Sequence, residues 1–182
     1  MSEISARYRA LSAEFTRRVQ AVPDERWEDP SPCEGWTARD VLRHMLDNHL
    51  NMPGHAGVKL ELTRSADDDP EGAWAEARDA MQAVLDDPAR AGAEYEGYFG
   101  RTNVADTVDR FLGFDLLVHA WDIARATGQD ETLPADQVHR YFTEIRGLGD
   151  AMRSPNVCGP EVPVPDDAPE QDRFLGFIGR TP

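Results

Sequence analysis

The sequence predicts an all-α protein, an antiparallel four-helix bundle with an extra C-terminal segment packed on it. Three observations predict this class. Apolar residues recur at spacings of three and four in several long segments, Gly and Pro fall between those segments, and period-two alternation is limited to a weak hint in "PEVPVP". Long helices with short to moderate connections are typical of helix bundles.

The helices are expected in order along the chain. Residues 4–22 place Ile4, Tyr8, Leu11, Phe15 and Val19 on one face before Pro23. The loop "WEDPSPCEGW" precedes a helix from Thr37 to about residue 51, with Thr37 and Asp40 as a capping pair. Later helices are expected over residues 70–85, over 103–127 with Gly128 as the stop, and over 134–152.

The chain of 182 residues is long enough for one domain over residues 1–182. The bundle is expected over about residues 3–153, and the extended, proline-rich tail over 154–182 ends in a short apolar helix. Burial of a large apolar side chain stabilises by about 1.5–3 kcal/mol. We therefore expect the tail to pack on the bundle through Phe174, Leu175, Phe177 and Ile178.

Composition excludes several functions. There are 34 acidic and 19 basic residues, a formal charge of -15, which repels nucleic acid and anionic membrane surfaces. Neither a signal peptide nor a membrane-spanning run is recognisable, so a cytoplasmic location is expected. Cys33 and Cys158 are too few for a disulfide framework and match no zinc or redox spacing, so we expect two ordinary thiols.

One helical segment carries an unusual polar stripe. In "FLGFDLLVHAWDIARATG", Asp115, His119 and Asp122 follow one another at spacings of four and three, within a segment that is otherwise apolar. The stripe is one side of a surface helix or it is buried. The apolar faces around it favour burial, and a buried carboxylate or imidazole needs a partner.

Two partners satisfy this stripe equally well. Asp115 and His119 project side by side at i, i+4 and can give one oxygen and one imidazole nitrogen to the same metal ion. An internal Asp–His hydrogen bond would satisfy the same groups without a metal. Both explanations stay open from the residues alone.

A catalytic metal site needs a third ligand from another helix and an open position. His44, in "RDVLRHMLDNHL", is the candidate, although the pattern of that helix also fits a histidine at its solvated boundary. Asn48 lies one turn further and would line the same pocket. His49 faces elsewhere, and His55 and His139 have the surroundings of surface histidines.

Three segments together resemble a known family. They are "WEDPSPCEGWTARDVLRHML", "DLLVHAWDIARATGQD" and "GPEVPVPDDAPEQDRFLGFIGR", and nearly the whole chain is covered. They resemble the actinobacterial metal-binding branch of the DinB-like superfamily, relatives of the N-terminal domain of mycothiol-dependent maleylpyruvate isomerase. The resemblance implies a DinB-like four-helix bundle holding a divalent metal, zinc or nickel, through His44, Asp115 and His119. Isomerase-like members have Glu where this chain has the shorter Asp115.

The resemblance also implies mycothiol as a cosubstrate and a thiol-dependent transferase or isomerase acting on a small electrophile. Asp122 is then a candidate for orienting His119 or moving a proton, with a salt bridge to Arg125 or a surface position as the alternatives. Trp36 and Trp121 are candidates for the pocket wall, and core positions would explain them too. The rival function is a non-catalytic metal- or ligand-binding protein. Many bundles of this kind are homodimers, and the sequence leaves the oligomeric state open.

Overall fold

The computed structural model describes residues 2–97, 100–148 and 158–182. The chain divides into two compact units, Met1–Asp130 and Glu131–Pro182, and each is described by itself. A single domain over the whole chain, and the packing of the tail on the bundle, stay predictions.

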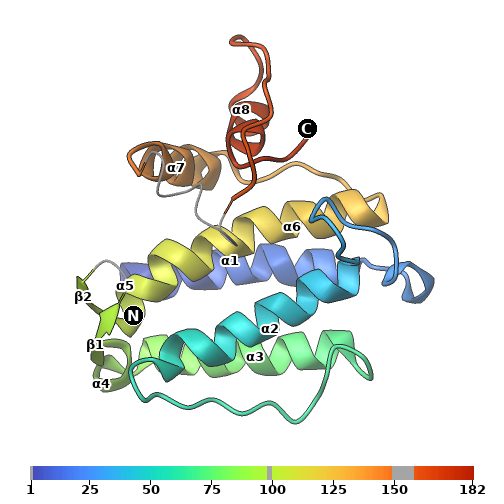
Figure 1. Ribbon diagram of the computed structural model, residues 1–182. Helices are drawn as coiled ribbons and strands as arrows, with labels where there is room; N and C mark the ends of the chain where they lie inside the picture. The colour runs from blue at the N-terminus through green and yellow to red at the C-terminus, as the bar shows by residue number, and fades with distance from the viewer. Residues whose placement is uncertain (1, 98–99, 149–157) are drawn as a thin grey trace. The chain divides into compact units, whose positions relative to one another are not determined.

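The N-terminal unit is a bundle of four long helices (Figure 1): α1 (Glu3–Gln20), α2 (Ala38–Gly54), α3 (Pro70–Asp86) and α6 (Gly113–Thr127). Helices α1 and α2 each pack against both α3 and α6. The chain runs in one direction along α1 and α6 and in the other along α2 and α3 (Figure 1). Helices of opposite direction therefore meet in the pairs α1–α3 and α2–α6, and the all-α bundle predicted from the sequence is confirmed.

Local chemistry sets the ends of these helices as predicted. The Thr37 hydroxyl accepts from the Asp40 amide while the Asp40 carboxylate accepts from the Thr37 amide, so α2 begins with a capping box. Helix α3 begins with Asp69 as its cap and Pro70 in its first turn. Helix α6 ends at Gly128, which takes a φ of 68°, a left-handed conformation that favours glycine.

The core of the bundle is formed by one face of each helix. Its largest fully buried side chains include Phe15, Trp74, Trp121, Leu42, Met45, Met81, Leu112 and Leu116. The bundle also buries polar groups, and one of them is His49, which lies between α1, α2 and α3 with its side chain fully enclosed. Its Nδ1 donates to the Met45 carbonyl at 2.6 Å, and its Nε2 accepts from the Tyr8 hydroxyl at 3.0 Å. The sequence prediction that His49 faces away from His44 agrees with this enclosure.

The helix predicted over residues 103–127 is observed from Val104 to Thr127, but it contains a π turn and is not α-helical throughout. The chain forms a short helix α5 (Val104–Thr107), a π-helical turn η2 (Val108–Leu112) and then α6. A π turn contains one residue more than an α turn, so it changes which residues face the bundle, and such turns are frequent at functional sites. The apolar spacing of this segment resembles an α-helix throughout, which is why the sequence gives no sign of the turn.

A hairpin was also missed. Strands β1 (Glu94–Gly97) and β2 (Gly100–Asn103) pair antiparallel, with Tyr95 opposite Thr102. Four-residue strands are too short for a clear alternating pattern. The hint of a strand in "PEVPVP" is not borne out, because none is described over residues 160–165. Shorter elements are η1 (Asp24–Arg26) and α4 (Pro88–Ala91).

The C-terminal unit contains α7 (Ala135–Arg146) and α8 (Glu170–Phe177). The Phe142 ring of α7 contacts Phe174 and Phe177 of α8 at centroid distances of 6.0 and 5.8 Å. The extended segment before α8 folds back on it, where the Val162 amide donates to the Gly176 carbonyl. The helix predicted over 134–152 is observed to residue 146, and residues 149–152 lie outside the described residues.

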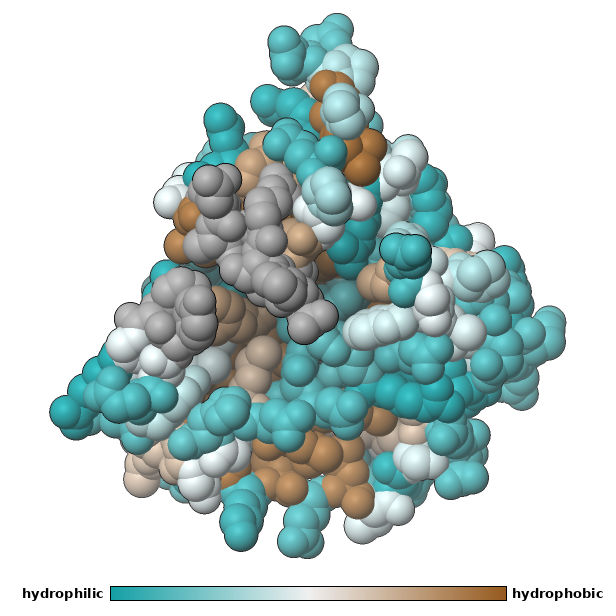
Figure 2. Space-filling view, viewed as in Figure 1, coloured by the Kyte–Doolittle hydropathy of each residue, from teal (hydrophilic) through white to brown (hydrophobic). Residues whose placement is uncertain are grey.

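The surface agrees with the high share of charged residues, 29% of the chain. Figure 2 shows mostly hydrophilic side chains over the face in view. Within the described residues, every helix is too short or too polar to cross a bilayer.

Candidate metal centre

Side chains from α2 and α6 meet on one side of the bundle. His44 of α2 and Asp115 and His119 of α6 each offer one ligand atom, and these three atoms lie within 4.8 Å of one another. The His44 and His119 rings meet edge to face at a centroid distance of 5.0 Å. The three residues expected to hold a metal are therefore brought together, although their helices are far apart in the sequence.

Asn48 joins two members of this cluster. Its amide nitrogen donates to His44 Nε2 at 3.0 Å and to Asp115 Oδ2 at 2.8 Å. Because Nε2 of His44 accepts this hydrogen bond, its lone pair points into the cluster and the ring proton is on Nδ1. The Asn48 amide thus binds two acceptor atoms, His44 Nε2 and Asp115 Oδ2, that lie close together. A cation would be stabilised between these two atoms.

The donor set fits a divalent metal. Ligand atoms bonded to one ion at about 2.1 Å lie at most about 4.2 Å apart. His44 Nε2 and Asp115 Oδ2 are 3.9 Å apart, within that limit, and the whole set needs only a small contraction. Imidazole nitrogen with carboxylate oxygen suits zinc, nickel and related ions. Three protein ligands leave at least one position for a small molecule.

Asp122 lies behind His119. The side chain of Asp122 is fully buried, and its Oδ2 accepts from His119 Nδ1 at 2.9 Å. This excludes the surface position considered for Asp122. It also shows that the metal and the Asp–His hydrogen bond are compatible, because a ring that donates through Nδ1 presents Nε2 to an ion.

The two histidines have opposite proton affinities. Burial lowers the pKa of His44 to about 4, and the charge of His119 acts in the same direction against a smaller opposing effect of Asp122. Burial also lowers the pKa of His119, but the hydrogen bonds with Asp122 and Cys33, together with nearby carboxylate charge, outweigh it and raise the pKa to about 10. The carboxylates around His119 thus stabilise positive charge at the centre of the cluster.

Cys33 joins the site from the loop before α2, and the sequence reasoning missed it. Its Sγ lies 3.4 Å from Asp122 Oδ2, and Cys33, His119 and Asp122 form a second group whose ligand atoms lie within 4.8 Å of one another. The loop is closed by a bridge between Pro30 and Thr37. Within it the Trp36 amide donates to the Cys33 carbonyl, and Gly35 takes the φ of 78° that such a turn requires.

The two tryptophans have different positions. Trp36 is 36% exposed, and its ring lies 5.1 Å from the His44 ring. With His44 and the charged residues Asp40, Arg43 and Asp47 it lines an open pocket of about 340 Å³. Trp121 is buried under the Arg125 guanidinium, and among the described residues no ring contact joins it to His44 or His119.

The remaining histidines lie elsewhere. His55 is exposed and stacks on Tyr95 at 5.8 Å, and His139 is exposed and pairs with Glu170 at 3.0 Å. Both therefore have the surface positions that the sequence predicts.

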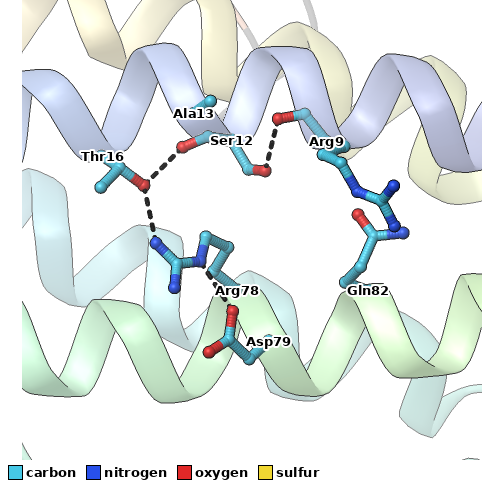
Figure 3. A pocket seen from close by; sticks show the side chains of 7 residues that line it. All are labelled: Arg9, Ser12, Ala13, Thr16, Arg78, Asp79 and Gln82. Atoms are coloured by element: carbon cyan, nitrogen blue, oxygen red, sulfur yellow. Dashed lines mark hydrogen bonds and ion pairs between the residues drawn. The ribbon is translucent and has the colours of Figure 1, made fainter.

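A second hollow of about 290 Å³ lies between α1 and α3 (Figure 3). Its polar groups bind one another: Arg78 donates to Asp79 and to the Thr16 hydroxyl, and Thr16 donates to the Ser12 carbonyl. None of the residues that line it is a histidine or cysteine. These hydrogen bonds join α1 to α3. The hollow therefore lacks the imidazole ligands that the His44 cluster contains.

Comparison with known proteins agrees with the fold. Residues 8–124 match the mycothiol maleylpyruvate isomerase N-terminal domain family. The uncharacterized proteins MT0763 and Rv0738, from two strains of Mycobacterium tuberculosis, are 28% identical over 186 residues, covering 100% of this chain and 99% of each relative. YfiT of Bacillus subtilis (strain 168), named as a proposed metal-dependent hydrolase, is 30% identical over 94 residues, or 50% of each chain. No solved structure matches. The chain therefore belongs to the mycothiol maleylpyruvate isomerase N-terminal domain family and is DinB-like.

Proposed function

We propose that this protein is a cytoplasmic, metal-dependent enzyme that uses a low-molecular-weight thiol, mycothiol, and acts on a small electrophile. It is either a transferase that joins the thiol to the electrophile or an isomerase that rearranges the electrophile with the help of the thiol. His44, Asp115 and His119 hold the ion, zinc or nickel. The family match supports the thiol, because mycothiol is part of the name of that domain. The observation that carries the proposal is a three-ligand cluster beside an open pocket.

A divalent ion at these ligands would supply Lewis-acid chemistry, lowering the pKa of a thiol and polarising a carbonyl of the electrophile. The protein residues place the reactants. His44 has a side chain 32% exposed, so the cluster is open to the pocket, while His119 and Asp122 close it on the core side. The exposed Trp36 ring forms one wall against which an apolar part of the substrate would pack.

Two residues keep the ligands in place. Asp122 holds the His119 ring through Nδ1 and keeps Nε2 directed to the ion. Asn48 donates to His44 and to Asp115, which holds both side chains in position for the ion. Asp122 is therefore proposed as a positioning residue, with proton transfer to or from His119 as its further role.

The proposal is tested by an activity assay. Purified protein loaded with Zn²⁺ or Ni²⁺ is expected to accelerate the reaction of mycothiol with members of a panel of small electrophiles, measured as loss of free thiol. The matched control is the Asp115→Ala variant with the same metal. If the rate equals that of free metal for every electrophile, the enzymatic function is rejected, and a non-catalytic metal-binding function is the alternative that stays.

The ligands themselves are tested by metal affinity. His44→Ala and Asp115→Ala are each expected to weaken Ni²⁺ binding by about 100-fold, the upper end of the range for loss of an outer-shell partner, because each removes a direct ligand. Isothermal titration calorimetry measures the affinity. His55→Ala, a change at an exposed histidine of the same unit, is the control and should bind as the wild type does. Unchanged affinity in the Asp115 variant would contradict the assignment.

A further inference from the structure

Cys33 has no part in the proposed function, and it forms a second cluster with His119 and Asp122. The Cys33 sulfur and the His119 Nδ1 approach the same carboxylate oxygen, Oδ2 of Asp122, at 3.4 Å and 2.9 Å. Thiolate, imidazole and carboxylate are the three ligand types that divalent zinc takes in proteins. The side chains come from two elements, the loop before α2 and helix α6.

The distances suit one ion. Zinc bonds to sulfur at about 2.3 Å and to oxygen at about 2.0–2.2 Å, so a sulfur and an oxygen on the same ion lie at most about 4.5 Å apart. The observed 3.4 Å between Cys33 Sγ and Asp122 Oδ2 is within that limit. The loop position of Cys33 is fixed by the bridge from Pro30 to Thr37 and by the turn at Gly35.

Charge also favours an ion at this place. Asp122 is fully buried and His119 is 7% exposed. Buried charges are stabilised by pairing or by metal coordination. A dication with one thiolate and one carboxylate is neutral overall, so Cys33 and Asp122 would leave no net charge in the core.

This cluster is distinct from the one at His44, because the two use opposite sides of one ring. Nδ1 of His119 faces Asp122, and Nε2 is the nitrogen that remains for an ion with His44 and Asp115. A neutral imidazole has a single lone pair. An ion on the Cys33 side therefore takes the lone pair of His119 away from the other cluster.

We propose that Cys33, His119 and Asp122 form a second divalent-metal site, selective for thiophilic ions, that competes with the His44 site for His119. The chain then holds one ion, and the softness of that ion decides which side of the ring it occupies. Binding on the Cys33 side displaces the thiol proton to solvent, and the neutral ring then carries its proton on Nε2 instead of Nδ1.

Titration with Co²⁺ tests the proposal, because a thiolate ligand adds an intense sulfur-to-cobalt charge-transfer band in the near ultraviolet. Wild-type protein is expected to bind one Co²⁺ and to show the band. His44→Ala, which disables only the other site, is expected to keep it. Cys33→Ser is expected to lose the band and still bind Co²⁺ at the His44 site, whereas Cys158→Ser, the matched control, keeps it.

Three results would overturn the second site: a wild-type protein without the band, a Cys33→Ser variant that keeps it, or a His44→Ala variant that loses it. The third result would mean that Cys33 is a fourth ligand of the His44 site. Circular dichroism is used to check that each variant is folded. If Cys33→Ser is not folded, Cys33→Ala takes its place. Failure of the proposed function is separate: it appears as loss of all Co²⁺ binding in Cys33→Ser while the wild type keeps its band.

Discussion

Replacement of His119 by alanine is expected to abolish divalent-metal binding by this protein. His119 belongs to both groups of ligands, the one with His44 and Asp115 and the one with Cys33 and Asp122. Every other single substitution leaves one group complete. Equilibrium dialysis against Ni²⁺ and Co²⁺ should therefore detect no bound ion in His119→Ala, a larger loss than in His44→Ala or Cys33→Ser.

The control for this prediction is folding. His119 is buried beside Asp122, so its removal leaves a buried carboxylate without one of its partners and lowers stability. His119→Gln keeps a polar side chain of similar length and is the second variant. If either variant is folded by circular dichroism and binds near one equivalent of Ni²⁺, His119 is not a ligand and both metal sites are wrong.

Acidification is expected to destabilise the bundle through His49. Burial lowers the pKa of His49 to about 4, against an ordinary value of 6.5 that the unfolded chain keeps. The unfolded state therefore binds more protons between these values, so stability is full above about pH 6.5 and falls as the pH drops to about 4. A difference of about 2.5 pKa units amounts to about 3 kcal/mol in total, of which about 2 kcal/mol is lost by about pH 4.5.

The measurement is the free energy of unfolding in urea at about pH 7.5 and about pH 4.5, for the wild type and for His49→Gln. Glutamine does not titrate, yet it can still accept from the Tyr8 hydroxyl, which lies 3.0 Å from Nε2 of the histidine. The wild type should lose about 2 kcal/mol more than the variant over this interval. Equal losses in both proteins would show that His49 does not remain neutral in the bundle.

The regular parts of the fold are predictable from the sequence because one rule governs each. The helical spacing of apolar residues located α1 and α3, and the Thr37–Asp40 pair located the beginning of α2. The π turn before α6 and the β1–β2 hairpin were not predictable. Both depend on tertiary contacts, such as the 2.6 Å hydrogen bond between the Tyr95 and Thr107 hydroxyls. A local sequence pattern does not reveal such contacts.

The residues of the candidate site also differ in how far the sequence predicts them. Asp115, His119 and Asp122 lie on one helix, where spacing alone shows that they share a stripe. His44 required the family resemblance, because its own helix also fits a solvated boundary. Cys33 lies in an irregular loop, where no period relates sequence distance to direction, so only the structure brings its sulfur to Asp122.

The most direct test of the central claim is anomalous X-ray scattering at the zinc edge from crystals of the protein grown with Zn²⁺ and without an affinity tag. A peak is expected at His119, within about 2.0–2.1 Å of a ring nitrogen. Its other ligands would be His44 and Asp115 at the proposed catalytic site, or Cys33 and Asp122 at the competing site. A fully occupied zinc held by other residues, or crystals that take up none, would contradict it.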